Sequence, residues 1–265
     1  MTIDPTADVH PLAVVETGAV IGPGCRIGPF AVVGPEVTLG ARVEVKPHAV
    51  VTGWTEVGDD TVIFPGACVG EVPQDLKFKG ERTRLIVGAR CKIREGATLN
   101  TGTEGGGGVT RVGDDCLLMT GAHVGHDASL GNRVILANQA AIAGHCQIGD
   151  DVIVGGLSGV HQWVRVGRGA IIGAVTMVTN DVLPHGLVQG PRGVLDGLNL
   201  VGLKRRGVER SEITALRAGY QMLAQGEGSF VERARRLAEE TDSPHVQEMT
   251  DFILSATDRS FLTPK

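Results

Sequence analysis

Aliphatic residues recur at every sixth position along most of the chain. They form two runs of twelve and a short run between them: Ile3, Val9, Val15, Ile21, Ile27, Val33, Leu39, Val45, Val51, Val57, Ile63 and Val69; Val87, Ile93 and Leu99; then Val112, Leu118, Val124, Leu130, Leu136, Ile142, Ile148, Val154, Val160, Val166, Ile172 and Val178. Period six fits neither a helix nor a simple alternating strand. It predicts short strands joined by sharp corners. With three strands per triangular coil, residues eighteen apart stack about 4.8 Å apart.

Glycine often follows the aliphatic residue, as at Gly22, Gly28, Gly34, Gly40, Gly58, Gly70, Gly113, Gly131, Gly149, Gly155, Gly167 and Gly173. Glycine suits a corner that needs a positive φ or a close backbone approach. We therefore predict a parallel β-helix over residues 1–191.

The repeat is interrupted twice, by EVPQDLKFKGERTR (71–84) and NTGTEGGGGVTR (100–111). Loops that leave a rigid scaffold often carry function, although each could also be a tolerated insertion. Gly105 to Gly108 do not form a phosphate-binding loop, because they lack the GKS/T ending and a following helix.

The pattern changes to helical spacing near the C-terminus. Ser211-Glu212 opens a stretch with apolar residues at Ile213, Leu216, Tyr220 and Leu223. Two more helices are expected at about 229–240 and 244–256. We predict a small helical domain over 192–265, which would cover the open edge of the last coil.

Composition agrees with a solenoid. The chain has 39 Gly and only 3% aromatic residues within a 42% hydrophobic content, so its core is built from small aliphatic side chains. A net charge of −5 gives no sequence-wide attraction to nucleic acid or anionic membranes. There is no run of eighteen apolar residues and no apparent signal peptide, which predicts neither a transmembrane segment nor secretion. Five scattered cysteines are expected to be buried or free thiols of a cytosolic protein.

Histidines of the second run offer the main candidate chemistry. His126 and Gly144 are eighteen residues apart, as are Asp127 and His145, so each pair is expected on neighbouring coils. A histidine base beside a glycine amide suits acyl transfer: the base takes a proton from a hydroxyl and the N–H stabilises the oxyanion. Asp127 would hold the imidazole tautomer.

Two alternatives remain open at this point. His123, His126 and His145 could ligate zinc, as histidines do in the carbonic anhydrases built on a β-helix of this kind. The chain could also be a scaffold or binding module without catalysis, in which the histidines line a groove.

The repeat [LIV]-G-x-x-x-x resembles that of hexapeptide acyltransferases, whose coils wind left-handed. More specifically, GEVPQDLKF (70–78), GAHVGHD (121–127), IAGH (142–145), VHQW (160–163) and LNLVGLKRRG (198–207) resemble the UDP-N-acetylglucosamine O-acyltransferase family, over nearly the whole chain. The related N-acyltransferases carry an extra N-terminal domain, for which the repeat starting at Ile3 leaves no room. The resemblance implies a cytoplasmic homotrimer with sites between subunits. It would transfer a 3-hydroxyacyl group from acyl carrier protein to the sugar 3-position, the first step of lipid A biosynthesis, without metal or cofactor.

The same resemblance implies roles for individual residues. His126 would be the general base, with Asp127 beside it and the Gly144 amide as oxyanion donor. Further substrate contacts would come from Gln74, Asp75, Lys77, His123, His145, His161, Gln162, Asn199 and Arg205. Arg206 and Arg217 would dock the acidic carrier protein. From the residues alone, Lys204-Arg205-Arg206 could equally be a solvated charge run, and Asp75 and Lys77 a surface ion pair.

Four positions matter for specificity. Better-known members of the family carry His-Arg where this chain has Asn100-Thr101, which raises a 3-amino sugar as an alternative acceptor. In segment 198–207, which the resemblance implies contacts the nucleotide, Val201 stands where the better-known members carry an acidic residue. Ala174 stands at the position that limits acyl-chain depth, and we expect it to shorten the preferred chain somewhat relative to glycine.

Overall fold

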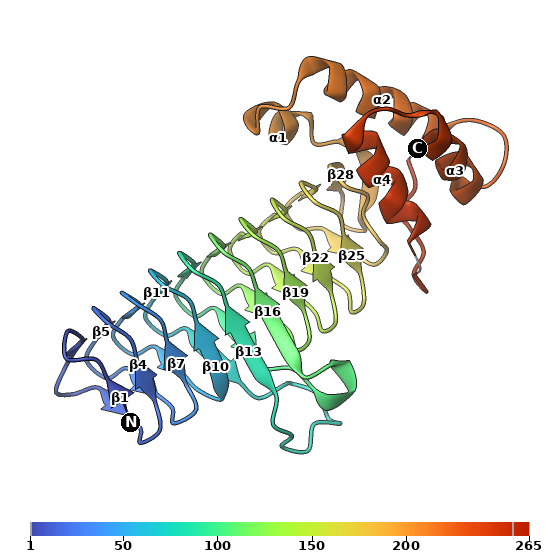
Figure 1. Cartoon of the computed structure of the whole chain (residues 1–265). Coiled ribbons are helices and arrows are strands. Elements are labelled where there is room, and N and C mark those ends of the chain that lie inside the picture. Colours follow the sequence, from blue (N-terminus) through green and yellow to red (C-terminus); the bar gives the residue numbers. More distant parts are fainter. Residues whose placement is uncertain (1, 256, 265) are drawn as a thin grey trace.

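The computed structural model describes residues 2–255 and 257–264 as a three-sided parallel β-helix followed by helices (Figure 1). Sheet A has nine strands: β1 (Thr2–Ile3), β4 (Val20–Ile21), β7 (Thr38–Leu39), β10 (Trp54–Val57), β13 (Arg84–Val87), β16 (Val109–Val112), β19 (Ser129–Leu130), β22 (Gln147–Ile148) and β25 (Arg165–Val166). Sheet B has eleven: β2 (Asp8–Val9), β5 (Arg26–Ile27), β8 (Glu44–Val45), β11 (Val62–Ile63), β14 (Lys92–Ile93), β17 (Leu117–Leu118), β20 (Ile135–Leu136), β23 (Ile153–Val154), β26 (Ile171–Ile172), β28 (Gly186–Gln189) and β29 (Val194–Leu198). Sheet C has nine: β3 (Val14–Val15), β6 (Val32–Val33), β9 (Val50–Val51), β12 (Cys68–Glu71), β15 (Thr98–Asn100), β18 (His123–Val124), β21 (Ala141–Ile142), β24 (Gly159–Val160) and β27 (Met177–Val178).

The predicted register is present. Where no loop intervenes, paired residues are eighteen apart, as in His123 opposite Ala141. The sixth-position residues form a continuous stack, from Ile21 to Val178, in which each side chain is at most 3% exposed. From Ala19 onward, a second buried position lies two residues earlier in each repeat and holds Ala, Cys, Ser, Thr or Val, with Leu85 as the exception. Four of the five free cysteines, Cys25, Cys91, Cys116 and Cys146, occupy such positions.

Close approach of the backbone, rather than a positive φ, explains the glycine after the aliphatic residue. Among the twelve glycines of the pattern only Gly70 has a positive φ. A Cβ at Gly22 would lie 2.4 Å from the Gly40 carbonyl oxygen of the next coil, and one at Gly113 would lie 2.6 Å from that of Gly131. Coils stacked at strand spacing leave no volume for a methyl group at Gly22 or Gly113.

Gly113→Ala is therefore expected to lower the free energy of unfolding by about 1–3 kcal/mol, the usual cost of overpacking a tight interior. Gly105→Ala is the matched control, because a Cβ there meets no atom within 4 Å. Denaturant unfolding of the two variants measures the difference. Equal midpoints would show that the corner relaxes at no cost.

Positive φ occurs two residues after the corner glycine, and there it is mostly carried by other residues. At the corner between sheets A and B these residues form an alternating charge ladder: Arg42, Asp60, Arg90, Asp115, Arg133 and Asp151. Their side chains pair along the axis, with distances of 2.7 Å for Arg42 Nε to Asp60 Oδ1, Arg90 Nε to Asp115 Oδ1 and Arg133 Nε to Asp151 Oδ1. The hydrogen bond from Arg133 holds the pKa of Asp151 below its ordinary value.

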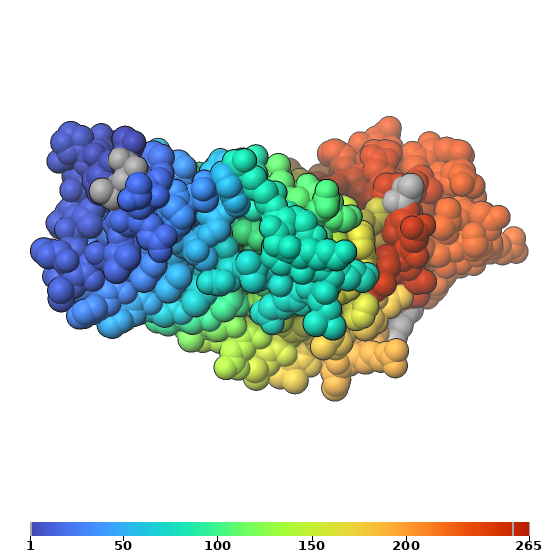
Figure 2. Space-filling model, turned by 90° about the horizontal axis from the view of Figure 1, so that it is seen from below, coloured from blue at the N-terminus to red at the C-terminus, as the bar shows by residue number. Residues whose placement is uncertain are grey.

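The two predicted loops leave the coils beside β13 and β16, on one side of the solenoid (Figure 1). The second contains a short 3-10 helix, η1 (Glu104–Gly106). Loop 71–84 lies on the same face as the C-terminal residues (Figure 2).

The last coil is covered in two ways. β29 folds back antiparallel onto β28, so the sheet continues beyond the predicted domain boundary at residue 191. Four helices follow: α1 (Leu200–Arg205), α2 (Arg210–Ala224), α3 (Phe230–Glu240) and α4 (Pro244–Leu254). The last three match the predicted helices, except that Ala256, the expected end of the third, lies outside the described residues.

The C-terminal tail returns to the solenoid. Asp181 pairs with Phe261 in a parallel bridge, and its fully buried carboxylate accepts a hydrogen bond of 2.7 Å from Arg165 Nε. Among the described residues, no helix has the length and apolar character needed to cross a membrane.

Candidate active site

His126 and Asp127 occupy the corner between sheets C and A, directly after β18. His126 Nδ1 lies 2.9 Å from Asp127 Oδ2, and the two side chains are only 9% and 1% exposed. Asp127 also accepts hydrogen bonds from the Thr103 amide (2.9 Å) and the Thr103 hydroxyl (2.6 Å). A carboxylate held by these donors favours the tautomer with the proton on Nδ1, which leaves Nε2 of His126 free to accept a proton.

The glycine-rich loop 100–111 wraps around the Asp127 carboxylate. A Cβ at Gly106 would lie 2.2 Å from the carboxylate carbon, and one at Gly102 would lie 2.7 Å from Oδ1. Thr110 Oγ1 accepts a hydrogen bond of 2.7 Å from the Asp127 amide. These glycines are thus needed for close approach to a buried acid.

Gly144 stacks against the His126 ring, as the eighteen-residue spacing predicts. A Cβ at Gly144 would lie 2.7 Å from both Cε1 and Nε2 of the imidazole. The Gly144 amide donates no hydrogen bond to any described residue. The reactive nitrogen of the histidine and an available backbone donor therefore lie side by side, as acyl transfer requires.

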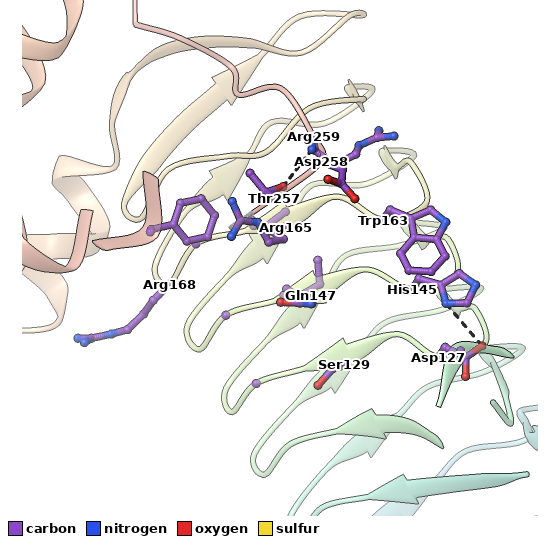
Figure 3. A pocket seen from close by; sticks show the side chains of 17 residues that line it. Asp127, Ser129, His145, Gln147, Trp163, Arg165, Arg168, Thr257, Asp258 and Arg259 are labelled. Atoms are coloured by element: carbon purple, nitrogen blue, oxygen red, sulfur yellow. Dashed lines mark hydrogen bonds and ion pairs between the residues drawn. The ribbon is translucent and has the colours of Figure 1, made fainter. Parts of the chain in front are cut away.

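Asp127, His145 and Trp163 follow one another along this corner, at the edge of a cleft of about 1130 Å³ (Figure 3). His145 Nδ1 is 3.7 Å from Asp127 Oδ2, and its ring stacks on exposed Trp163 with centroids 3.8 Å apart. Burial lowers the pKa of His145; the charge of Asp127 opposes this effect. Asp75 raises and Lys77 lowers the same pKa, so loop 71–84 lies within electrostatic reach.

His123 lies on β18, three residues before His126, and His161 follows β24, two coils further along the solenoid. His123 Nδ1 lies 2.8 Å from Thr98 Oγ1, and burial, with a smaller contribution from His126, lowers the pKa of His123. His161 is exposed, and its Nδ1 lies 3.4 Å from Arg259 Nη2 of the C-terminal tail.

The potential metal ligands differ from those expected. Within the described parts of the chain, the atoms that lie within 4.8 Å of one another at this site belong to His126, Asp127 and His145, while His123 is not among them. Asp127 Oδ2 already contacts His126 and Thr103. This arrangement is that of a base oriented by a carboxylate.

Comparison with known proteins agrees with this geometry. A family profile described as "Udp N-acetylglucosamine O-acyltransferase; Domain 2" matches residues 181–262, and one described as "Bacterial transferase hexapeptide (six repeats)" matches 18–53 and 110–144. The acyl-(acyl-carrier-protein)–UDP-N-acetylglucosamine O-acyltransferase of Rhizobium johnstonii is 48% identical over 264 residues, which cover 99% of this chain and 97% of that protein. This chain belongs to the UDP-N-acetylglucosamine O-acyltransferase family.

Other relatives support the same assignment. The enzyme of the same name from Paracoccus denitrificans is 67% identical over 204 residues, 77% of each chain. The UDP-N-acetylglucosamine acyltransferase from Campylobacter jejuni, a solved structure, has a TM-score of 0.92 at 37% identity and covers 97% of this chain and 100% of its own.

Several of the residues that the O-acyltransferase family resemblance implies lie at, or against, three different corners. His126, Asp127, Gly144, His145, His161 and Gln162 share the corner between sheets C and A, and Ala174 follows β26 at the corner between B and C. Asn199 and Arg206 contact Gly169, at the corner between A and B. The three corners of a triangular coil are apart, so residues at different corners of one chain do not meet in a single site.

Several predicted contact residues already have partners within the chain. Asn199 caps α1 through a 2.9 Å hydrogen bond from the Gly202 amide, and Lys77 N donates to Asp75 Oδ1 at 2.9 Å. Arg206 is half-buried with its guanidinium turned toward Gly169, whereas Arg205, Gln74 and Arg217 are exposed.

Asn100 and Thr101, the departures from the better-known members of the O-acyltransferase family, tie the two loops together. Asn100 Nδ2 donates to the Val72 carbonyl at 2.9 Å, and the Thr101 hydroxyl accepts from Thr83 Oγ1 at 3.1 Å. Both side chains are buried. Val201, the third departure, is 60% exposed on α1.

Thr103 and Gly106 lie against Asp127, although the repeat pattern does not predict either as its partner. Loop 100–111 breaks the eighteen-residue count, so spacing cannot place its residues. The available signal was a cluster of four glycines beside a candidate catalytic coil, since glycine clusters mark close backbone approach.

Asp127→Asn is expected to lower kcat by about 10²-fold, at the lower end of the general-base contribution. The new amide would present N–H to His126 Nδ1 and favour the tautomer that carries its proton on Nε2, which cannot accept one. Thr103→Ser is the control, because it keeps both hydrogen bonds to Asp127. Steady-state kinetics measure the effect, and unchanged turnover of Asp127→Asn would contradict the orienting role.

Proposed function

We propose that this chain transfers a 3-hydroxyacyl group from acyl carrier protein to the 3-hydroxyl of UDP-N-acetylglucosamine, the first acylation of lipid A biosynthesis. The observation that carries the proposal is the pair of contacts made by His126: its Nδ1 lies 2.9 Å from Asp127, and its ring lies across Gly144. Family membership supports the same substrates.

In the proposed mechanism, Nε2 of His126 removes the proton from the sugar hydroxyl as its oxygen attacks the thioester carbonyl carbon. The tetrahedral oxyanion accepts a hydrogen bond from the Gly144 amide. Collapse breaks the carbon–sulfur bond, and His126 returns its proton to the departing thiolate. The products are an ester and the carrier thiol, so no oxidant, reductant or cofactor enters the balance.

We propose that the residues around His126 and Gly144 contact the substrates. His145 lies at the same corner as His126, His123 lies on β18 just before that corner, and Asp75 and Lys77 lie within electrostatic reach of His145. Gln74, His161 and Gln162 are exposed and would supply further contacts. Asn199 and Arg205 would contact the nucleotide from a neighbouring copy of the chain.

We propose that the active assembly is a homotrimer with its sites between subunits. Catalytic, acyl-chain and nucleotide positions lie at three separate corners, so a complete site needs corners of different copies. Light scattering with chromatography and activity across the peak test this. A fully active monomer would overturn it.

We propose that the carrier protein docks on a groove of about 550 Å³ between α1 and α2, whose lining includes exposed Lys204, Arg210 and Arg217. Basic groups steer an acidic partner. Arg217→Glu is expected to raise KM for the acyl donor about tenfold and leave KM for the UDP-sugar unchanged, a loss in the range seen for charged interface contacts. Arg235→Glu on α3 is the control, and equal donor KM values would exclude Arg217 from docking.

The function itself is tested with purified protein, 3-hydroxyacyl carrier protein and UDP-N-acetylglucosamine, with chelator present. Ester product that is insensitive to chelator supports the proposal, whereas loss of activity to chelator would favour the zinc alternative. The 3-amino analogue of the sugar is assayed in parallel. Preferential turnover of the analogue would assign Asn100-Thr101 to an amide-forming enzyme, and no product with either acceptor would favour a scaffold. Fractionation of cells tests the proposed cytoplasmic location.

A further inference from the structure

The charge ladder at the corner between sheets A and B continues into the helical region. After Asp151, the next ladder position is Gly169, which has no side chain. The guanidinium of Arg206 enters the vacant place, since a Cβ on Gly169 would lie 2.6 Å from Arg206 Nη2 and 2.6 Å from His185 Nδ1. The side chain of a residue that follows α1 thereby lies against the corner of a solenoid coil.

His185 is the next member of the ladder and is fully buried. Its φ of 59° matches the other ladder residues. Nδ1 lies 3.3 Å from Arg206 Nη2, and Nε2 lies 3.4 Å from Glu248 Oε2 on α4. The ring of His245, also on α4, is edge-on at 5.4 Å. His185 is therefore in contact with the solenoid, Arg206 and α4 at once.

The hydrogen-bond donors around His185 indicate whether these residues bind a metal ion or only one another. Arg206 can only donate, so Nδ1 of His185 accepts and the ring proton is on Nε2, facing Glu248. The same three residues, His185, His245 and Glu248, are close enough to hold a metal ion. A metal on Nε2 would put the proton on Nδ1, against Arg206, and would lie near Arg168, whose Nη1 is 3.6 Å from Glu248. The contacts favour a hydrogen-bonded junction.

The residues of this junction also contact segment 198–207, which the proposed function assigns to nucleotide binding. The Asn199 amide donates to the His185 carbonyl at 2.7 Å, and Asn199 Nδ2 donates to the Gly169 carbonyl at 3.0 Å. Arg205 is next to Arg206. The backbone and ring of His185 thus fix both ends of α1.

We propose that His185 is a positioning residue for UDP-sugar binding: its Nδ1 holds Arg206 in the Gly169 gap, which orients α1 and the Asn199 and Arg205 side chains. This rests on the proposed function, in which those two residues contact the nucleotide. His185 itself touches neither substrate nor reacting atoms.

The test compares His185→Leu with His185→Asn. Asparagine places Oδ1 near the position of Nδ1 and keeps the acceptor for Arg206, whereas leucine removes it; Leu157 shows that leucine is accommodated at this backbone geometry, with φ 59°. His48→Leu is the matched control, since His48 is a corner histidine with φ 62° on a distant coil. KM for both substrates, kcat, the dissociation constant of UDP and the melting temperature are measured for each.

For His185→Leu we expect KM for the UDP-sugar and the dissociation constant of UDP to rise about tenfold, the cost of losing a charged hydrogen bond. We expect kcat and KM for the acyl donor to stay within about twofold. His185→Asn and His48→Leu should resemble the wild type. Equal UDP affinity in His185→Leu and wild type would overturn the proposal, as would a parallel loss for both substrates or equal damage in His185→Asn. An inactive wild type would instead overturn the proposed function.

Discussion

His126→Ala is expected to lower kcat by at least about 10³-fold, within the range that a positioned general base contributes. The variant keeps Asp127 bound to Thr103, so the corner retains its shape while the imidazole that lies 2.9 Å from Asp127 and against Gly144 is lost. Rapid quench or steady-state assays measure the loss. KM for either substrate should change much less, because the base acts in the transition state.

The control for His126→Ala is His48→Ala, which removes a histidine that stacks on Phe30 far from the site. Both variants should melt within a few degrees of the wild type. If His126→Ala retained more than a tenth of wild-type kcat, His126 would not be the base. His145, the other histidine near Asp127, would then be the candidate.

Gly144→Ala is expected to lower kcat by about 10²- to 10³-fold, the range measured when an oxyanion donor is lost. The new Cβ would lie 2.7 Å from Nε2 of His126, a distance that forces the imidazole to move. Displacement of the ring moves the base from the bound hydroxyl and covers the Gly144 amide. Two elements of the mechanism are thus disturbed by one methyl group.

Gly105→Ala again provides the control, since its Cβ meets open space. We expect Gly144→Ala to fold normally, because the crowded atoms belong to the side chain of His126 rather than to the backbone and its ring can rotate. A crystal structure of the variant would show that rotation. Wild-type turnover with an unmoved ring would contradict both the crowding and the proposed oxyanion site.

The regular part of the molecule could be predicted from the sequence because one rule governs it. An aliphatic residue at every sixth position fixes strands, corners and the stacking of residues eighteen apart, so His126 on Gly144 follows by counting. The helices from Arg210 to Leu254 were found because their apolar residues keep a helical period.

The features that were not predicted lie where the six-residue repeat is interrupted or has ended. Thr103 reaches Asp127 from a loop of irregular length, and β28, β29 and α1 fall in a segment rich in glycine without a period. Arg206 was expected to face a partner protein, but the absence of a side chain at Gly169 lets its guanidinium fold inward. Such complementarity between distant residues is set by tertiary packing, which no local pattern encodes.

The ladder from Arg42 to Asp151 also bears on how the chain folds. Coils of nearly identical shape and aliphatic content offer little to distinguish one neighbour from the next, so a growing solenoid could skip a coil and still bury its core. Skipping Asp60 would bring Arg42 against Arg90, and skipping Arg133 would bring Asp115 against Asp151. Because every such slip places like charges together, the alternation penalises misregistered folding intermediates. The exposed edge thereby encodes the order of coils that the core leaves ambiguous.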